Sequence, residues 1–150
     1  MIKLKIYLDN CCYNRPFDYP ANEEVLAETE AKLFIQSLVK YGDLSLVSSF
    51  VLYSEVIEIP AEYKRNSILN FIDQYADKHI GSEEKSNVLL MSKEIMKTGI
   101  KAADATHVAC AIIAKCSFFI TTDKRLLKFK TDSIQLLDPV KFVKTWEVMI

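Results

Sequence analysis

The stretch Ser117-Phe118-Phe119-Ile120-Thr121-Thr122-Asp123 predicts a buried strand that ends in a carboxylate. A short, continuous apolar run between polar residues is typical of a strand that is covered on both faces, as in a parallel sheet. The same pattern opens the chain, where the run Ile6-Tyr7-Leu8 is followed by Asp9. Because ligands bind beyond the carboxyl ends of the strands in open parallel sheets, both aspartates are candidates for a functional site.

Strands and helices alternate along the whole sequence, which predicts an α/β fold with a mostly parallel sheet. Apolar runs and alternating patterns predict strands at residues 2–8, 44–47, 79–80, 117–121 and 133–137. Helical periodicity and capping residues predict helices at residues 21–40, from 48 or 49 to Pro60, 61–76, 82–98, 101–115 and from Pro139 onward.

The bulk composition indicates one globular domain over residues 1–150. Half of the residues are hydrophobic, and the formal net charge is only −1, so the chain has no basic excess that would coat a nucleic acid. The four cysteines lack zinc-site spacing. The longest apolar stretch, residues 108–114, is far too short to span a bilayer, and the N-terminal run is too short for a signal peptide. We therefore expect a cytoplasmic protein without membrane contact.

Four acidic residues lie where such a fold can direct them at one point: Asp9, Glu55, Asp104 and Asp123. Asp104 is the most informative, because it stands among small and apolar residues where an unpaired charge is costly to bury. Taken singly, each acid also fits a turn, a helix cap, a first-turn acid or a solvated surface residue. Taken together, four carboxylates would repel one another unless a cation lay between them. Mg²⁺ or Mn²⁺ is the simplest choice, because both ions prefer oxygen ligands.

Polar residues beside these acids are candidates for supporting roles or for contacts with a substrate. We expect Thr121 and Thr122 to hydrogen-bond Asp9 or Asp123. The charged candidates that would steer phosphates are Arg15, Lys124 and Arg125, with solvated surface charges as the alternative, and Asn10 is a further supporting candidate. For His107 we expect a packed or hydrogen-bonded structural role, and the alternative is a general acid.

Three segments of the chain resemble the PIN-domain family, in the family's order. They are Asp9 to Asp18, Lys101 to Ala111 with the sequence KAADATHVACA, and Phe119 to Leu127; Glu55 resembles a fourth motif by its place after the second strand. The resemblance spans nearly the whole chain. It implies a three-layer α/β/α sandwich with a mostly parallel central sheet, and it implies that Asp9, Glu55, Asp104 and Asp123 bind the metal.

The resemblance also implies a function, since PIN domains are metal-dependent nucleases and many bacterial members are toxins of toxin–antitoxin pairs. We therefore expect an endoribonuclease that hydrolyses single-stranded RNA with Mg²⁺ or Mn²⁺. An antitoxin protein and a second copy of the chain remain open as partners. The alternatives are a non-catalytic RNA- or protein-binding module on the same scaffold, or another acidic-pocket α/β protein. A haloacid-type phosphatase is disfavoured because Cys11 stands where it needs an aspartate, and a receiver domain because the last strand has no lysine.

Overall fold

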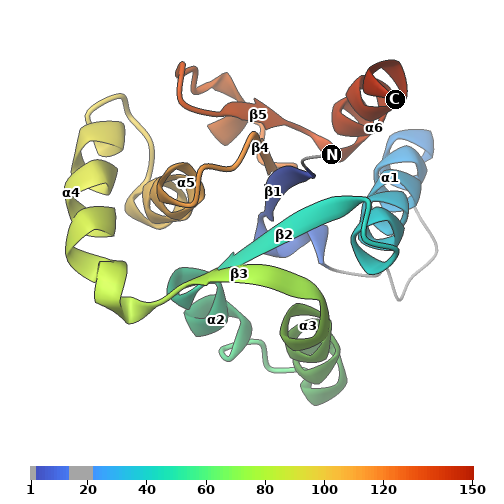
Figure 1. Cartoon of the computed structure of the whole chain (residues 1–150), viewed down its shortest axis with the longest axis horizontal. Coiled ribbons are helices and arrows are strands. Elements are labelled where there is room, and N and C mark those ends of the chain that lie inside the picture. Colours follow the sequence, from blue (N-terminus) through green and yellow to red (C-terminus); the bar gives the residue numbers. More distant parts are fainter. Residues whose placement is uncertain (1–2, 14–21) are drawn as a thin grey trace.

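The computed structural model describes residues 3–13 and 22–150, and it contains a five-stranded sheet. The strands lie in the order β3-β2-β1-β4-β5, and every adjacent pair is parallel (Figure 1). Their bounds are β1 Leu4–Leu8, β2 Leu44–Ser49, β3 Ala76–Ile80, β4 Phe118–Ile120 and β5 Gln135–Leu137. The predicted α/β class with a parallel sheet is confirmed.

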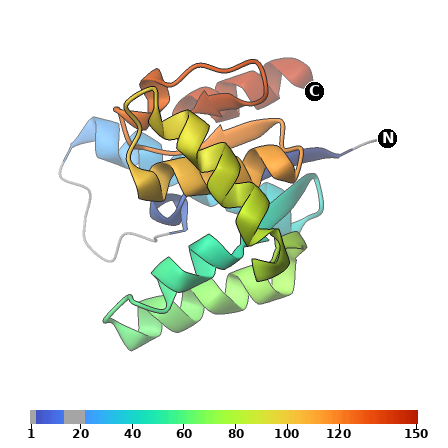
Figure 2. The ribbon, with the colours of Figure 1, turned by 90° about the vertical axis from the view of Figure 1, so that its left-hand side faces the viewer.

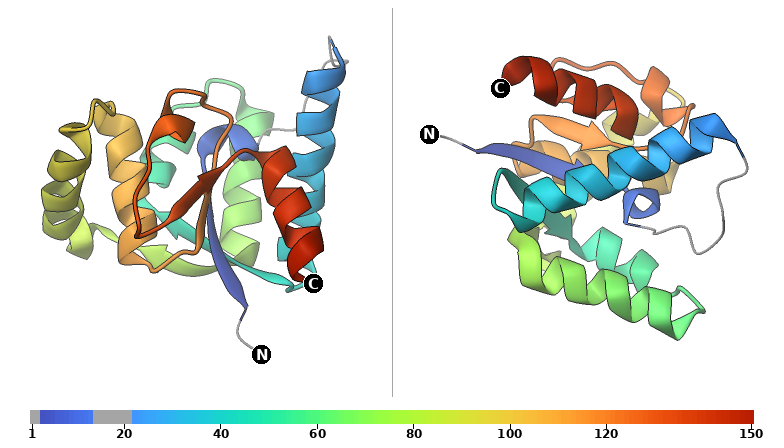
Figure 3. Two further views of the ribbon diagram at one scale, coloured as in Figure 1. Left: turned by 90° about the horizontal axis from the view of Figure 1, so that it is seen from above. Right: turned by 90° about the vertical axis from the view of Figure 1, so that its right-hand side faces the viewer.

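Helices connect the strands and cover both faces of the sheet. Their bounds are α1 Glu23–Lys40, α2 Phe50–Val56, α3 Glu62–Tyr75, α4 Lys85–Met96, α5 Ala102–Ile113 and α6 Pro139–Met149. Short 3₁₀ turns also occur at η1 Asn10–Cys12, η2 Ser82–Glu84 and η3 Leu126–Lys128. In Figure 2, α4 and α5 lie on one side of the sheet. The right-hand view of Figure 3 shows the other side, where α1 lies between α6 and α3.

Alternation along the strands divides the core into two parts, because successive side chains of a strand point to opposite faces. Ile6 and Leu8 face a cluster that includes residues of α1, α2, α3 and α6. Tyr7, between them, faces a second cluster built mainly from α4 and α5. The molecule is therefore a three-layer α/β/α sandwich, as the resemblance implied.

The helix boundaries follow from capping chemistry. Asn22, Ser49 and Asp138 each accept a hydrogen bond from a backbone N–H of the helix that follows, and Pro139 occupies the first position of α6 as predicted. Gly42, just beyond α1, has a φ of 82°, a left-handed conformation that favours glycine at the end of a helix. Because Ser49 is both the last residue of β2 and the cap of α2, this helix begins directly at the carboxyl end of the strand.

The structure differs from the sequence prediction at α2, which ends at Val56 and not at Pro60, and at β3, which covers Ala76–Ile80 instead of residues 79–80. Ala76 pairs with Leu46 and Lys78 pairs with Val47, so the neighbouring strand imposes extended structure on residues that have no strand pattern of their own. The predicted helix over 82–98 begins with the 3₁₀ turn η2. Among the described residues, none of the helices has the length and hydropathy required to cross a membrane.

Candidate active site

The candidate site lies at the carboxyl edge of the sheet, where β1, β2 and β4 end. Asp9 directly follows β1, and its backbone N–H donates to the carbonyl of Ile120 at 3.0 Å, which extends the pairing of β1 with β4 by one residue. Ser49 ends β2 and begins α2. At this edge β1 has β2 on one side and β4 on the other, so the order of the strands reverses here. Open parallel sheets bind ligands at such a point.

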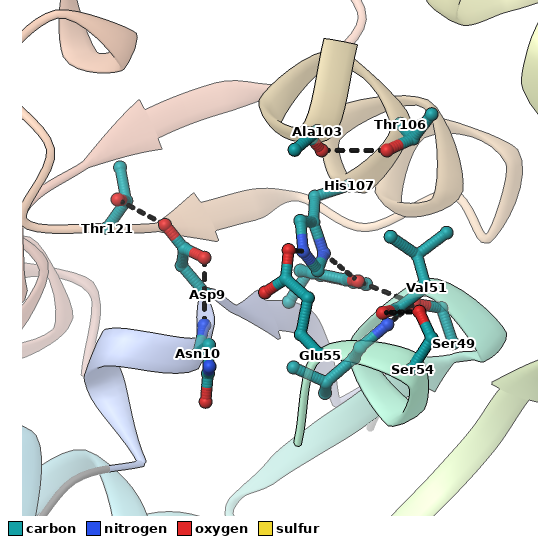
Figure 4. A network of polar contacts seen from close by, with 12 residues as sticks. Asp9, Asn10, Ser49, Val51, Ser54, Glu55, Ala103, Thr106, His107 and Thr121 are labelled. Carbon is teal, nitrogen blue, oxygen red and sulfur yellow. Dashed lines mark hydrogen bonds and ion pairs between the residues drawn. The ribbon is translucent and has the colours of Figure 1, made fainter. Parts of the chain in front are cut away.

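Two hydrogen bonds hold the carboxylate of Asp9 in place. The hydroxyl of Thr121, which is fully buried, donates to Oδ2 at 2.7 Å, and the backbone N–H of Asn10 donates to Oδ1 at 2.8 Å (Figure 4). The Thr121 hydroxyl also accepts from the backbone N–H of Asp123 at 3.1 Å. Thr121 therefore connects the two aspartates that follow β1 and β4, and the predicted contact with Asp9 is confirmed.

Glu55 reaches the same place from the second turn of α2. Helix α2 begins at the cap Ser49, whose hydroxyl accepts from the N–H of Leu52 at 3.0 Å. The half-buried Glu55 carboxylate accepts from Nε2 of His107 at 2.7 Å. Ligand atoms of Asp9, Glu55 and His107 all lie within 4.8 Å of one another, which is close enough for one small cation. The two carboxylates supply hard oxygen donors, which suit Mg²⁺ or Mn²⁺.

His107 is almost completely buried, with 1% of its surface exposed, and both of its ring nitrogens have partners. Nδ1 lies 2.6 Å from the hydroxyl of Tyr7, and that hydroxyl lies 2.6 Å from the hydroxyl of Ser49. Burial raises the pKa of Tyr7 well above its ordinary value, so its hydroxyl stays protonated. The expectation of a hydrogen-bonded histidine is confirmed, and the buried chain of Ser49, Tyr7 and His107 ends on Glu55.

Asp104 lies on the first turn of α5 and is half-buried. Burial raises its pKa, and the negative charges of Asp123 and Asp9 raise it further, whereas His107 and Lys101 act in the opposite direction. Asp104 thus lies in the electrostatic field of two other acids of the predicted set. The group of possible ligand atoms within 4.8 Å of one another contains Asp9 and Glu55 but not Asp104, so it is the first two carboxylates whose geometry fits a divalent metal.

Asp123 is exposed at the rim of this group and shapes the turn that follows β4. Its Oδ1 accepts from the backbone N–H of Arg125 at 2.9 Å and from that of Leu126 at 3.2 Å. The turn role that the sequence offered as an alternative is therefore present. The charge of Asp123 also raises the pKa of Asp104, so Asp123 lies near enough to the acidic group to influence it.

The remaining predicted residues are exposed or make other contacts. The hydroxyl of Thr122 donates to Sγ of Cys11 at 3.2 Å and not to an aspartate. Lys124 is exposed and lies 4.0 Å from Glu24, and Arg125 is exposed. The side-chain oxygen of Asn10 is buried without a partner among the described residues. Arg15 lies outside the described residues.

Sequence reasoning missed Tyr7 and Ser49 as parts of the site. Tyr7 is completely buried and lies inside an apolar run, where an aromatic residue is read as core. Its one distinguishing signal is the hydroxyl, since a buried tyrosine O–H needs a partner and phenylalanine would serve packing alone. The sequence indicates Ser49 as a candidate cap and as the start of the segment that leads to Glu55, but nothing in it indicates the contact with Tyr7.

Comparison with solved structures shows what this fold is similar to. A chain of VapBC2 from Rickettsia felis, in a crystal structure with a DNA fragment from its promoter, matches with a TM-score of 0.56 and 12% identity over 90% of this chain and 98% of that one. The protein has a PIN-like fold. FitAcB from Neisseria gonorrhoeae matches with a TM-score of 0.54 and 22% identity over 89% of this chain and 97% of that one.

A chain of FitAB bound to an IR36 DNA fragment matches the same PIN-like fold with a TM-score of 0.55 and 22% identity, over 90% of this chain and 95% of that one. No protein-family model matches the sequence, and no curated protein matches it. At these identities the likeness concerns the fold, and it agrees with the family that the sequence motifs resemble. The PIN-like fold implied by the sequence is confirmed.

Proposed function

We propose that this protein is a divalent-metal-dependent endoribonuclease that hydrolyses phosphodiester bonds of single-stranded RNA. The observation that carries the proposal is the approach of the Asp9 and Glu55 carboxylates at the carboxyl edge of a PIN-like sheet, with Asp104 in the field of Asp9 and Asp123. A bound Mg²⁺ or Mn²⁺ supplies an activated water and neutralises charge on the phosphate.

The residues of this edge divide into metal ligands, supporting residues and residues that attract the substrate. Asp9, Glu55, Asp104 and Asp123 hold the metal, and Thr121 orients Asp9 through its hydroxyl. Lys124 and Arg125 are exposed beside Asp123, where their charges attract the phosphates of an approaching strand. The contributions proposed for Asn10 and Thr122 are structural, through η1 and the contact with Cys11.

We further propose that the nuclease is the toxin of a toxin–antitoxin pair in the cytoplasm, with an antitoxin protein as its partner. The support is the fold shared with chains of VapBC2 and FitAB, together with the sequence resemblance to toxin members of the PIN family. Co-expression with the protein encoded by the adjacent reading frame tests this part. Growth arrest by the nuclease alone, relieved by that neighbour, is the expected result.

The central experiment is cleavage of a labelled single-stranded RNA by purified protein with Mg²⁺ or Mn²⁺ and with EDTA. Glu55→Gln should abolish cleavage because it removes an anionic ligand with almost no change in volume. Glu58→Gln, an exposed acid just beyond α2, is the matched control and should leave cleavage unchanged. Equal cleavage by the wild type and by Glu55→Gln would reveal a contaminating nuclease and would reject the assignment. Metal-free RNA binding without cleavage would favour a binding module.

A further inference from the structure

We propose that His107 is a positioning residue for Glu55 and is not itself a metal ligand, and that the buried hydroxyls of Tyr7 and Ser49 hold its ring in that role. The proposal rests on the proposed metal-dependent function. It assigns a purpose to a chain of polar groups that runs from the cap of α2, through the middle of β1, to the acidic edge.

The direction of the hydrogen bonds follows from the ends of this chain. An ionised carboxylate only accepts, so the 2.7 Å contact with Glu55 requires a proton on Nε2 of His107. In the neutral ring Nδ1 is then the acceptor, and the Tyr7 hydroxyl donates to it at 2.6 Å. The Tyr7 oxygen in turn accepts from the Ser49 hydroxyl at 2.6 Å. Every group is satisfied in this arrangement.

This proton placement decides between the two roles open to His107. A histidine binds a metal through a nitrogen that carries no proton. Nε2, the nitrogen nearest the acids, is committed to Glu55, and Nδ1 is committed to Tyr7. The imidazole therefore fixes one oxygen of Glu55 and leaves the other for the ion. Metal-binding carboxylates are commonly oriented by hydrogen bonds of this kind.

The side chains around this chain of hydrogen bonds are closely packed. Tyr7 has no exposed surface, and its ring stacks on Phe119 with centroids 5.3 Å apart and an interplanar angle of 9°. The ring of His107 meets the Tyr7 ring edge-on at 5.7 Å. The three polar groups come from β1, the start of α2 and α5, so each hydrogen bond also fixes one element relative to another. A fully paired buried network of this type specifies geometry, and its members are costly to leave half-satisfied.

Two His107 variants separate positioning from ligation. His107→Gln keeps an N–H donor at about the place of Nε2, whereas His107→Leu removes it. We expect Mn²⁺ affinity, measured by titration calorimetry, to fall roughly 10–100-fold in His107→Leu and to change less than about 3-fold in His107→Gln. Equal losses in both variants would overturn the proposal, as would a directly coordinated nitrogen in pulsed electron paramagnetic resonance of the Mn²⁺-bound wild type.

Nitrogen NMR of the metal-free protein tests the proton placement independently of the metal. We expect a proton on Nε2 of His107, and a proton on Nδ1 alone would overturn the proposal. Tyr7→Phe should broaden or shift these nitrogen signals, whereas Tyr13→Phe should not, because the buried Tyr13 hydroxyl lies outside the chain and has no partner among the described residues. Absence of Mn²⁺ binding by the wild type would reject the proposed function and the positioning role toward a metal. The NMR result would still decide whether His107 donates to Glu55.

Discussion

Thr121 donates its hydroxyl to Asp9 across the seam between β4 and β1, over 2.7 Å, although the two residues are 112 positions apart in the chain. Thr121 is completely buried, and its bond is to a charged acceptor. Such bonds are stronger than those between neutral groups. The orientation of Asp9 therefore depends on the residue that directly follows another strand, β4.

Thr121→Val is the substitution that removes this bond with little change in shape. We expect Mn²⁺ affinity to fall by about 10-fold or more, because an oriented ligand loses its support. Stability should fall by about 1–3 kcal/mol, because the substitution also leaves the N–H of Asp123 without its acceptor. Thr122→Val is the matched control, since the Thr122 hydroxyl contacts Cys11, and it should leave metal affinity unchanged. Equal effects of the two variants would show that Thr121 has no specific role.

Asp104→Asn should stabilise the metal-free protein at neutral pH. The pKa of Asp104 is raised in the folded state, so the folded protein binds the proton of this carboxyl more tightly than the unfolded chain does. The folded protein therefore loses stability as the pH rises from the pKa of Asp104 in the unfolded chain to its pKa in the folded protein. The neutral amide avoids this loss. Because the group is half-exposed, we expect only about 0.5 kcal/mol, or roughly 1–2 °C in the melting temperature.

The melting series for Asp104→Asn is run in EDTA at pH 3 and pH 7, and again with Mg²⁺. The advantage of the variant should disappear at the lower pH, where the wild-type carboxyl is protonated in both states. With Mg²⁺ the order should reverse, since a ligand stabilises the state that binds it. An Asp104→Asn protein that is less stable in EDTA at pH 7 would contradict the repulsion inferred for this carboxylate.

Ser49→Ala should affect stability and metal binding together. The Ser49 hydroxyl caps α2 and also contacts Tyr7, so its loss removes a cap worth about 1 kcal/mol and the first member of the buried chain. Asn22→Ala removes the corresponding cap of the exposed start of α1 and is the matched control. Denaturant titration should show a loss for both variants. Calorimetry with Mn²⁺ should show weaker binding for Ser49→Ala alone.

Cys11 should be the most reactive thiol of the protein. A hydrogen bond from the neighbouring Cys12 lowers its pKa to about 6, against the effect of burial, and Thr122 also favours the thiolate. Burial raises the pKa of Cys110 to about 11 and that of Cys116 to about 12, so these thiols stay protonated. In EDTA, iodoacetamide labelling of Cys11 should rise with pH around 6, as measured by mass spectrometry of the labelled peptides. Labelling that begins only above pH 8 would contradict this assignment.

Residue patterns predicted most of the architecture because the buried strands are strongly marked. The apolar runs before Asp9 and Asp123 locate β1 and β4, and the parallel arrangement then places the two aspartates at one edge. The start of β3 escaped prediction because Ala76 and Lys78 have no strand preference and follow the pairing offered by β2.

The sequence indicated four candidate acids, and the structure brings the carboxylates of Asp9 and Glu55 together with His107. Spacing along the chain placed Glu55 and His107 on their helices, but it contains no information on which side chains meet across α2 and α5. The same holds for Tyr7. Its apolar neighbours in the sequence indicate that it is buried, but only the folded structure shows which groups contact its hydroxyl. Asp123 has a turn role as well, which a sequence pattern cannot separate from metal binding.

The position of β1 in the sheet has a consequence for synthesis of the protein. β1 is made first, yet it lies between β2 and β4, and its second neighbour, β4, is complete only at residue 120. A nascent chain that ends before β4 therefore has β1 with an open edge, which invites aggregation or pairing with another chain. Such a product also lacks Thr121 and Asp123. Under the proposed function, a chain that is truncated before Thr121 lacks part of the acidic edge and should have no nuclease activity.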